Sequence, residues 1–298
     1  MAVAILGGGA WGKALYHALS QKNEVNIVSR SILGAGFKQC SLEEASQKEY
    51  LILAISTAFL RDFLAQTNIP KTSKLLVAAK GIEEDSGALV SEILEKFFPK
   101  NSLAYLAGPS FAAEVNQSLP CAVVIHSYNL PLAKEFSTLF PSFMRTYCSD
   151  DVIGGEIAGA YKNVIAIASG ICEGLCLGQN AKAALLARGL VEMSRFGEFF
   201  GAKMETFLGL SGAGDLFLTS SSILSRNYRV GLFLAQKMPL EEIIVKIGEV
   251  AEGIKTSQAI NILAKKHQIY TPIASEISNI IQGKDAQKSL NDMLLHNR

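Results

Sequence analysis

The first twelve residues constrain the fold of this chain more than any other stretch. Residues 2–6 are apolar and include Val and Ile, which is typical of a buried parallel strand. Gly7, Gly9 and Gly12 follow with the spacing G-x-G-x-x-G, directly before a helical pattern that starts near Ala10. In dinucleotide sites these glycines serve the tight turn, the approach of the pyrophosphate and helix packing, in that order. The stretch therefore indicates a dinucleotide site, with a purely structural glycine turn as the alternative.

Apolar segments alternate with helical patterns over the first half of the chain. After the first strand, further strands are expected at 24–29, 50–55, 74–79, 103–106, 121–126 and 144–147. Helices are expected between them at 10–21, 58–66, 87–98, 111–116 and 131–140. Strands separated by helices of this length form a mainly parallel sheet that is covered on both faces. We therefore predict an α/β fold with a doubly wound, Rossmann-type domain over residues 1–150.

The pattern changes after Asp150, where long helical periods begin and strand candidates nearly vanish. The helix expected at 152–171 is rich in Gly, Ala and Ser, which allow helices to approach one another closely. A chain of 298 residues suits two domains, because single cores rarely grow beyond roughly 250–300 residues. We therefore predict an all-α domain over residues 151–298.

The end of the second expected strand bears on the choice of dinucleotide. A carboxylate at this point usually binds the ribose 2′-OH of NAD, whereas a basic residue accommodates the 2′-phosphate of NADP. Here the strand ends in Ser29-Arg30, so Arg30 favours or at least tolerates NADP, with an exposed surface charge as the alternative. The passage 31–38 is short and leaves scarcely room for a full helix before the next strand.

Composition narrows the classes of function. Lys and Arg number 28 and Asp and Glu 27, a net charge of +1, which argues against a nucleic-acid partner. No run approaches the roughly 18 apolar residues of a membrane span, and the N-terminus lacks a basic signal-peptide region, so a cytoplasmic protein without an integral membrane segment is expected. The five cysteines form no CxxC pair, so no metal is expected. A mean hydropathy of +0.25 makes a homodimer plausible.

Polar residues in apolar surroundings are the candidates for chemistry. Lys162 lies inside the small-residue helix, where burial without a partner is unfavourable and desolvation lowers the pKa of a lysine towards the range of proton transfer. A lysine at the helix surface is the alternative. Asp215 stands at a turn bounded by glycines, where a helix N-cap is the alternative. None of the four histidines has a partner pattern typical of a base, so lysine is the better candidate.

Two further groups suit an anionic ligand. Ser225-Arg226-Asn227 resembles a helix start, which would combine backbone N–H groups with a guanidinium and so suit a phosphate, with a capped surface helix as the alternative. Lys80 and the segment 108–114 follow expected strands, and the carboxyl ends of parallel strands border the ligand crevice.

Together these motifs resemble the NAD(P)-dependent glycerol-3-phosphate dehydrogenase family of the bacterial type. The match runs from Gly7 to about Pro272, and its order and spacing are specific although each motif alone is modest. The motifs are Gly7-Gly-Gly-Ala-Trp-Gly12, Lys80-Gly-Ile-Glu83, Gly108-Pro-Ser-Phe-Ala112, Gly159-Ala-Tyr-Lys-Asn-Val164, Asn180 with Arg188-Gly189, Gly214-Asp-Leu216, Ser225-Arg-Asn227 and Val250-Ala-Glu-Gly253.

The resemblance implies reversible hydride transfer between NAD(P)H and dihydroxyacetone phosphate, giving sn-glycerol 3-phosphate for phospholipid synthesis. Lys162 would be the general acid and base, and NADP or NAD the cofactor, with no metal. The implied substrate contacts are Lys80, Gly108, Ser110, Lys162, Asp215, Ser225, Arg226 and Asn227. The implied cofactor contacts are Gly7, Gly9, Ala10, Trp11, Gly12, Arg30, Lys80, Ala112, Arg226, Val250 and Glu252.

The chain departs from the family pattern at three places. Ala10 and Ser56 stand where serine and proline are common in the family, and the short segment after Arg30 leaves the choice between NAD and NADP open.

Two other functions remain as alternatives. A β-hydroxyacid dehydrogenase would place an asparagine four residues after the catalytic lysine, where this chain has Ala166. A sensor that binds NAD(P) without turnover would leave Lys162 and Asp215 without a purpose.

Overall fold

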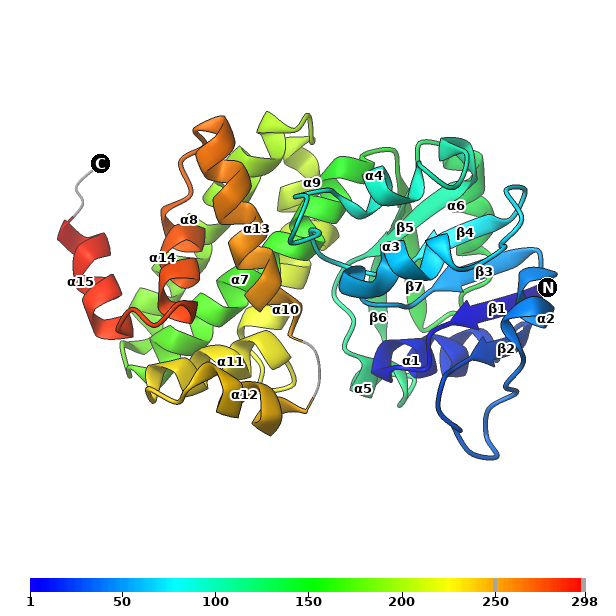
Figure 1. Ribbon diagram of the computed structural model, residues 1–298, viewed down its shortest axis with the longest axis horizontal. Helices are drawn as coiled ribbons and strands as arrows, with labels where there is room; N and C mark the ends of the chain where they lie inside the picture. The colour runs from blue at the N-terminus through cyan, green and yellow to red at the C-terminus, as the bar shows by residue number, and fades with distance from the viewer. Residues whose placement is uncertain (249–250, 296–298) are drawn as a thin grey trace. The chain divides into compact units, whose positions relative to one another are not determined.

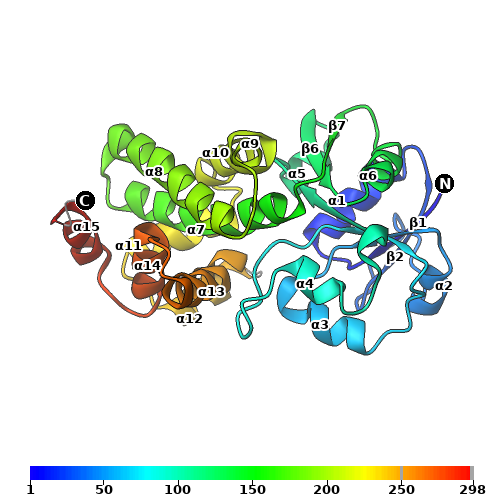
Figure 2. The same cartoon turned by 90° about the horizontal axis from the view of Figure 1, so that it is seen from above.

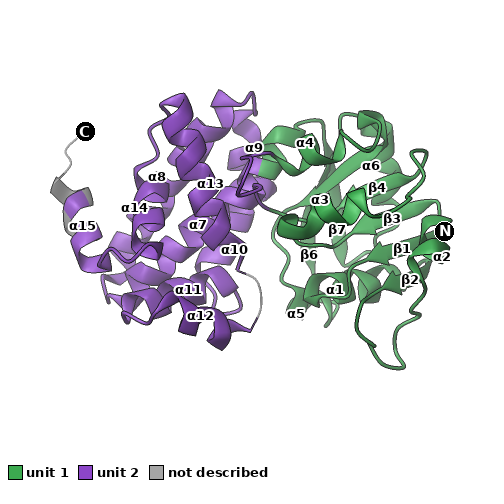
Figure 3. Ribbon diagram, in the orientation of Figure 1, with its two compact units in different colours: residues 1–80, 89–156 green, residues 81–88, 157–298 purple. Residues whose placement is uncertain are grey.

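The computed structural model describes residues 1–248 and 251–295, which form two compact units. Unit 1 comprises residues 1–80 and 89–156, and unit 2 comprises residues 81–88 and the chain from 157 onwards (Figure 3). The domain division predicted at residue 150 lies close to the last junction between the units, and it stays a prediction. Unit 2 is discontinuous in sequence, because its first eight residues come from the loop after the fourth strand.

The strands described in unit 1 form a single seven-stranded sheet with the order β2-β1-β3-β4-β5-β6-β7 (Figure 1). Their bounds are β1 (Ala2–Leu6), β2 (Glu24–Val28), β3 (Tyr50–Leu53), β4 (Lys74–Val77), β5 (Leu103–Ala107), β6 (Cys121–His126) and β7 (Met144–Ser149). The first five strands are parallel, whereas β6 runs antiparallel to β5 and parallel to β7. The predicted strands are all present, and the mainly parallel sheet is confirmed.

The helices of unit 1 cover both faces of the sheet. They are α1 (Ala10–Leu19), α2 (Leu42–Ser46), α3 (Thr57–Ala65), α4 (Val90–Leu94), α5 (Ala112–Val115) and α6 (Leu130–Ser137), with a 3-10 turn at Lys100–Ser102. Figure 2 shows α1, α5 and α6 on one face and α3 and α4 on the other. Side chains of β1 such as Val3 and Ile5 are fully buried against α1 and α6, so the doubly wound prediction is confirmed.

One local prediction in unit 1 needs correction. The helix expected at 87–98 is only the five residues of α4, because residues 81–88 pack in unit 2. There Gly87 has a φ of +70°, and a Cβ on it would lie 2.8 Å from Leu263. Before β3 the chain has only the five-residue α2, which starts with a capping box between Ser41 and Glu44, in agreement with the expectation that a full helix scarcely fits there.

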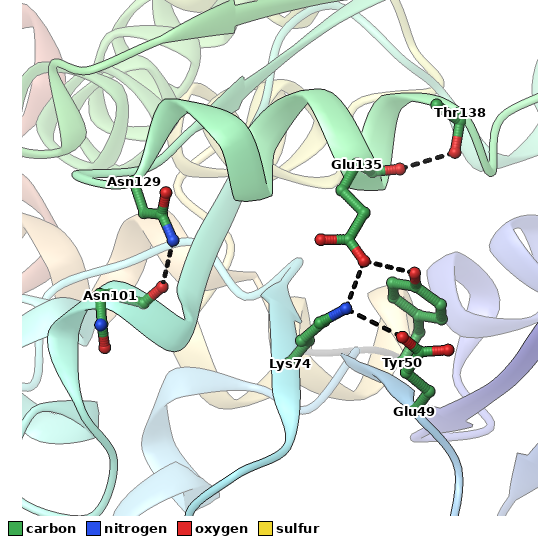
Figure 4. Close-up of polar contacts among 7 residues, drawn as sticks. All are labelled: Glu49, Tyr50, Lys74, Asn101, Asn129, Glu135 and Thr138. Atoms are coloured by element: carbon green, nitrogen blue, oxygen red, sulfur yellow. Dashed lines mark hydrogen bonds and ion pairs between the residues drawn. The ribbon is translucent and has the colours of Figure 1, made fainter.

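A polar cluster fastens α6 to the amino-terminal ends of β3 and β4 (Figure 4). Lys74 contacts the carboxylates of Glu49 and Glu135, and the Tyr50 hydroxyl donates to Glu135. The bond to Glu135 raises the pKa of Lys74, and burial with that same carboxylate raises the pKa of Tyr50 to about 12. The cluster lies at the edge of the sheet opposite the glycine loop, so its role is structural.

In the described part of unit 2 every element is helical. They are α7 (Val152–Gly174, whose first residues belong to unit 1), α8 (Gly178–Phe199), α9 (Met204–Leu208), a π-helical turn (Leu210–Gly214), α10 (Asp215–Ser220), α11 (Arg226–Ala235), α12 (Leu240–Ile247), α13 (Glu252–His267), α14 (Pro272–Ile281) and α15 (Ala286–Leu295). Residues 157–172 of α7 are buried, which makes α7 the central helix.

Helices α7 and α11 cross at two glycines. A Cβ on Gly170 would lie 2.0 Å from the carbonyl oxygen of Tyr228, and one on Gly231 would lie 2.0 Å from that of Ile167. Backbones can approach this closely only where neither residue carries a side chain, so the small-residue expectation for the central helix is confirmed. No helix within residues 1–248 or 251–295 combines the length and apolar character needed to span a bilayer.

Candidate active site

The glycine loop after β1 is shaped by steric limits at two of its three motif positions. Gly7 has a φ of +126°, and a Cβ on it would lie 2.4 Å from the carbonyl oxygen of Ala54. A Cβ on Gly12 would lie 1.9 Å from the carbonyl oxygen of Gly7. Gly9 differs, because no atom lies within 4 Å of where its Cβ would be. The backbone at Gly9 is therefore open to a ligand.

The amino end of α1 provides donors beside this opening. Gly9 is the N-cap and offers no side-chain hydrogen bond, and the first turn has no acidic residue. The N–H groups of Ala10, Trp11 and Gly12 consequently lack acceptors within the helix and favour an anion. Strand β1 lies between β2 and β3, so the loop stands at the point where strand order reverses. These features fit the pyrophosphate of a dinucleotide.

The other predicted residues of unit 1 follow the carboxyl ends of its parallel strands. Arg30 is exposed beyond β2, and Lys80 is half-buried beyond β4. Gly108 follows β5 with a φ of +109°, and the Ser110 hydroxyl donates to its carbonyl oxygen at 3.2 Å. Ala112 begins α5 and packs against the core. All of these positions share the strand edge that carries the glycine loop.

In unit 2 the structure brings Lys162, Asp215 and Thr219 together. Lys162 Nζ donates to Asp215 Oδ1 at 2.7 Å and to Thr219 Oγ1 at 2.8 Å, and Thr219 Oγ1 lies 3.2 Å from the same carboxylate oxygen. Lys162 is 6 % exposed and Asp215 is 2 % exposed. A surface lysine is therefore wrong here, whereas the expected pairing of a buried lysine is confirmed. Asp215 is not the N-cap of α10, because Gly214 occupies that position.

The turn before α10 sets the direction of Asp215. Residues 210–214 form a π-helical turn in which the Gly214 N–H donates to the Gly209 carbonyl at 3.1 Å. A Cβ on Gly212 would lie 2.1 Å from the Phe207 carbonyl oxygen, so only glycine fits. Asp215 and Thr219 then lie one turn apart on the face of α10 that meets Lys162.

The motif Ser225-Arg226-Asn227 begins α11, as predicted. The Ser225 hydroxyl caps the helix by accepting from the Tyr228 N–H at 3.2 Å, and Arg226 is the half-buried first residue. Asn227 is buried, and its Oδ1 accepts from the Gly253 N–H at 3.0 Å. The amide of Asn227 therefore holds the amino end of α13, and its NH₂ group supplies two further donors.

The last motif lies partly outside the described residues. Glu252 is the half-buried first residue of α13. Val250, expected at the cofactor, lies outside the described residues. A Cβ on Gly253 would lie 2.8 Å from both the Asn163 carbonyl oxygen and Asn227 Oδ1, so α13 begins in backbone contact with α7.

Reasoning from sequence missed Thr219 and gave no role to Asn163. Thr219 is the fourth residue after Asp215, a spacing that places both on one helical face and could have signalled it. Asn163 donates to the Gly159 carbonyl at 3.2 Å and is buried beside the start of α13. Across the described chain, no group of three His, Cys, Asp or Glu residues could hold a metal ion.

The two units thus offer different chemistry. Unit 1 has a backbone turn whose shape and donors fit a pyrophosphate, and unit 2 has a buried ammonium group that is held by a carboxylate and a hydroxyl. A lysine fixed in this way can donate a proton to an oxygen that gains negative charge. An anion cradle and a proton donor are the elements that hydride transfer to a carbonyl requires.

Family models match both parts of the chain. The model described as NAD-dependent glycerol-3-phosphate dehydrogenase N-terminus matches residues 37–133, and the corresponding C-terminus model matches residues 151–292. Each match is to a whole family rather than to a single protein.

Individual relatives agree with these matches. A glycerol-3-phosphate dehydrogenase [NAD(P)+] of Wolinella succinogenes is 63 % identical over 298 residues, with all of both chains covered. That of Helicobacter hepaticus is 57 % identical, with 96 % of this chain and 97 % of the relative covered. A crystal structure of glycerol-3-phosphate dehydrogenase from Coxiella burnetii matches with a TM-score of 0.92 and 31 % identity, over 99 % of each chain.

Proposed function

The chain belongs to the NAD-dependent glycerol-3-phosphate dehydrogenase family, and on this premise we propose how its residues perform the family's reaction. The enzyme is an oxidoreductase that interconverts dihydroxyacetone phosphate and sn-glycerol 3-phosphate with NAD(P)H. When bound, the nicotinamide carries the hydride that the substrate carbon gains or loses. The product supplies phospholipid synthesis.

Lys162 is the acid and base of this proposal. As the carbonyl of dihydroxyacetone phosphate is reduced, its oxygen gains negative charge, and Lys162 Nζ donates a proton to it. In the reverse direction the neutral amine takes the proton from the hydroxyl. Asp215 and Thr219 hold Nζ at 2.7 and 2.8 Å and so fix its direction. This buried cluster is the observation that carries the proposal.

The remaining predicted residues bind and orient. Arg226, at the amino end of α11, suits the substrate phosphate, because a guanidinium combines with helix N–H groups there. The proposed substrate contacts are Lys80, Gly108 and Ser110 of unit 1 and Lys162, Asp215, Ser225, Arg226 and Asn227 of unit 2. The proposed cofactor contacts within the described residues are Gly7, Gly9, Ala10, Trp11, Gly12, Arg30, Lys80, Ala112, Arg226 and Glu252.

The test is the loss of reduced-nicotinamide absorbance when dihydroxyacetone phosphate is added to the purified protein with NADH or NADPH. We expect rapid turnover with at least one cofactor and a stoichiometric yield of sn-glycerol 3-phosphate. If the protein bound a cofactor without consuming the substrate, the reaction would be rejected in favour of a sensor, and turnover of a β-hydroxyacid alone would favour the other dehydrogenase class.

A homodimer is the proposed assembly. The exposed face of α8 carries Ala183, Ala187 and Val191, and Val191 is 55 % exposed. Apolar side chains in a row on a helix are typical of a face that meets another protein surface. Light scattering coupled to gel filtration should give twice the mass of the chain, and Val191→Glu should shift the protein towards the monomer.

A cytoplasmic location is also part of the proposal. All five cysteines of the chain are free thiols in the structure, which is typical of a reducing compartment. Fractionation of cells should recover the enzyme with other cytoplasmic NAD(P)-linked activities, and recovery in the membrane pellet would contradict this.

A further inference from the structure

Helix α10 carries two of the three residues of the buried cluster, but it is too short to hold its own position. It comprises the six residues Asp215–Ser220, which is fewer than two turns at about 3.6 residues per turn. Isolated helices shorter than about 12–15 residues are marginal in water, because few backbone bonds offset the cost of ordering the chain. The positions of Asp215 and Thr219 beside Lys162 therefore depend on the contacts of α10 with its neighbours.

The carboxyl end of α10 is bound by a side chain of another helix. The last carbonyl groups of a helix have no partner within that helix. Here the Ser221 N–H reaches the Leu218 carbonyl only at 3.5 Å, so the backbone closes this end weakly. The Ser220 carbonyl accepts from the Ser169 hydroxyl at 2.7 Å. Helix α7 thus caps the carboxyl end of α10.

The bond between Ser169 and Ser220 lies in the interior of unit 2. Both residues are fully buried. A serine hydroxyl has one proton to donate, and inside a helix it often donates to the carbonyl four residues earlier in the same helix. The proton of Ser169 goes to α10 instead. Loss of this donor would leave a buried carbonyl oxygen unsatisfied, which costs more than the loss of an exposed bond.

The face of α7 that carries Ser169 is the face that carries Lys162. The two residues are seven positions apart, which places them two turns apart on one side of the helix. Lys162 contacts the side chains of Asp215 and Thr219, and Ser169 contacts the main chain one residue after Thr219. Helix α7 therefore holds α10 both by its side chains and by its main chain.

These two contacts respond differently to the proposed reaction. The contact between Lys162 and Asp215 is an ion pair, which weakens when Lys162 gives its proton to the substrate oxygen and becomes neutral. The bond from Ser169 joins two neutral groups, so its strength does not depend on the charge of Lys162. It is therefore suited to hold α10 in place before and after the proton transfer.

We infer that Ser169 is a positioning residue of this enzyme, whose hydroxyl holds α10 so that Asp215 and Thr219 keep the ammonium group of Lys162 directed at the substrate oxygen. The inference rests on the proposed function in one respect, namely the role of Lys162 as acid and base. Ser169 itself takes no part in the proton transfer.

The start of α11, with its proposed phosphate contacts, is fixed to α7 by a different contact. A Cβ on Gly170 would lie 2.0 Å from the Tyr228 carbonyl oxygen, and one on Gly231 would lie 2.0 Å from that of Ile167. This contact between two backbones does not involve α10. Loss of the Ser169 hydroxyl should therefore lower kcat and leave the KM for dihydroxyacetone phosphate nearly unchanged.

The first test is Ser169→Ala, assayed for kcat and KM with dihydroxyacetone phosphate. A misplacement of about 1 Å costs about a hundredfold in rate, so partial relaxation of α10 should lower kcat by roughly threefold to thirtyfold. The KM should stay within about twofold of the parent value. An unchanged kcat, or a fall in kcat/KM that came from KM alone, would overturn the inference.

Two other serine variants are the controls. Ser220→Ala removes a buried hydroxyl that has no hydrogen-bond partner among the described residues, and it retains the carbonyl that Ser169 binds. Ser194→Ala removes a buried hydroxyl that donates to the Leu190 carbonyl of its own helix at 2.9 Å. Both variants should keep kcat close to the parent value. An equal fall in all three variants would show a general loss of packing and reject the assigned role.

Hydrogen exchange of the α10 amides gives a readout besides activity. Exchange at residues 215–220 should be about fivefold faster in Ser169→Ala than in the parent, the equivalent of one neutral hydrogen bond, and unchanged in Ser220→Ala. Equal exchange in the parent and Ser169→Ala would overturn the anchoring of α10. Absence of turnover in the parent would contradict the proposed function, whereas this comparison would still decide whether Ser169 holds α10.

Discussion

Units 1 and 2 build their halves of the chemistry from different parts of the chain. In unit 1 the groups proposed to face the ligand are backbone N–H groups at the start of α1, and Gly7 and Gly12 lie where a Cβ would meet a carbonyl oxygen. In unit 2 the groups proposed to react are side chains, and Lys162 bonds to Asp215, 53 residues away in sequence, and to Thr219, 57 residues away.

This difference separates two kinds of sensitivity. A backbone cradle is damaged by added atoms, since any Cβ at a close approach displaces main chain. A side-chain cluster is damaged by removed atoms, because each deletion leaves a buried polar partner unsatisfied. The predictions below therefore use added atoms in unit 1 and removed atoms in unit 2.

The largest effect is expected from Lys162→Ala. Loss of the proton donor should lower kcat by about two to four orders of magnitude, because that is the usual contribution of general acid catalysis. Binding of adenine nucleotides to unit 1 should persist. Lys182→Ala is the control, since Lys182 is paired with Glu173 and Tyr228 in the same unit but has no role in the proposed chemistry. A kcat close to the parent value in Lys162→Ala, with the fold intact by circular dichroism, would remove Lys162 from catalysis.

In unit 1 the pair Gly12→Ala and Gly9→Ala distinguishes a packing glycine from a ligand glycine. The Cβ at residue 12 would lie 1.9 Å from a carbonyl oxygen, so Gly12→Ala should lower the free energy of unfolding by about 1–3 kcal/mol and also weaken nucleotide binding. The Cβ at residue 9 meets nothing within 4 Å, so Gly9→Ala should weaken binding with little loss of stability. Chemical denaturation and nucleotide titration measure the two effects. Equal destabilisation by both variants would contradict the distinction.

Acid should destabilise unit 1 through the buried side chain of His126. This tests whether the stability of unit 1 depends on side chains, although its glycine loop uses backbone groups. Burial lowers the pKa of His126 to about 4, from an ordinary value of 6.5, and the carboxylates of Asp151 and Asp150 oppose part of that shift. The unfolded chain therefore binds this proton first as the pH falls. Stability present above pH 6.5 should decline towards pH 4, by about 3 kcal/mol in total.

His126→Gln is the comparison for this pH effect. The difference in unfolding free energy between the parent and this variant should shrink between neutral pH and pH 4, whereas carboxylates elsewhere affect both proteins alike. Parallel pH profiles for the two proteins would show that His126 does not titrate in this range.

Arg226→Ala tests whether binding in unit 2 depends on a side chain in the same way as catalysis. The KM for dihydroxyacetone phosphate should rise by roughly tenfold to a hundredfold, the worth of charge-assisted bonds to a phosphate, with a smaller change in kcat. An unchanged KM would exclude Arg226 from the phosphate site.

The smallest effect is expected in the polar cluster at the far edge of the sheet (Figure 4). Glu135→Gln should lower the free energy of unfolding by about 0.2–1 kcal/mol, because Lys74 and Glu135 form a partly exposed ion pair. Glu49→Gln should have less effect, since Glu49 is 58 % exposed at its side chain and contacts Lys74 from the outside. Turnover should be unchanged in both. A loss of several kcal/mol would mean that unit 1, like unit 2, depends strongly on a side-chain cluster, which would contradict the contrast between the two units.

What could be predicted from sequence follows the same division. The glycine loop is contiguous, so spacing alone indicated it, and buried strands such as residues 121–126 have a local apolar signature. Strand direction has no local signature, so the antiparallel pairing of β6 with β5 was not predicted. The helix expected at 87–98 was too long, because its periodicity could not show that Gly87 packs against Leu263.

The side-chain contacts of unit 2 could be predicted from the sequence only in part. The burial of Lys162 predicted that a partner exists, but nothing local identified Asp215 as that partner or brought in Thr219. The family resemblance supplied a substrate role for both Lys162 and Asp215, and the three-residue contact came only from the packing of α10 against α7. Side chains that meet across 50 or more residues are set by tertiary structure, which a single sequence does not display.

The eight residues that unit 2 takes from the loop after β4 limit the modularity of this enzyme. Gly87 packs on Leu263, and Glu84 pairs with Lys255 at 3.3 Å, so this segment finds its partners in sequence that the ribosome makes more than 160 residues later. A fragment that ends at residue 156 would carry the segment without those partners. No single cut in the gene can therefore yield both units whole, and any exchange of one half between relatives has to transfer residues 81–88 together with the helical half.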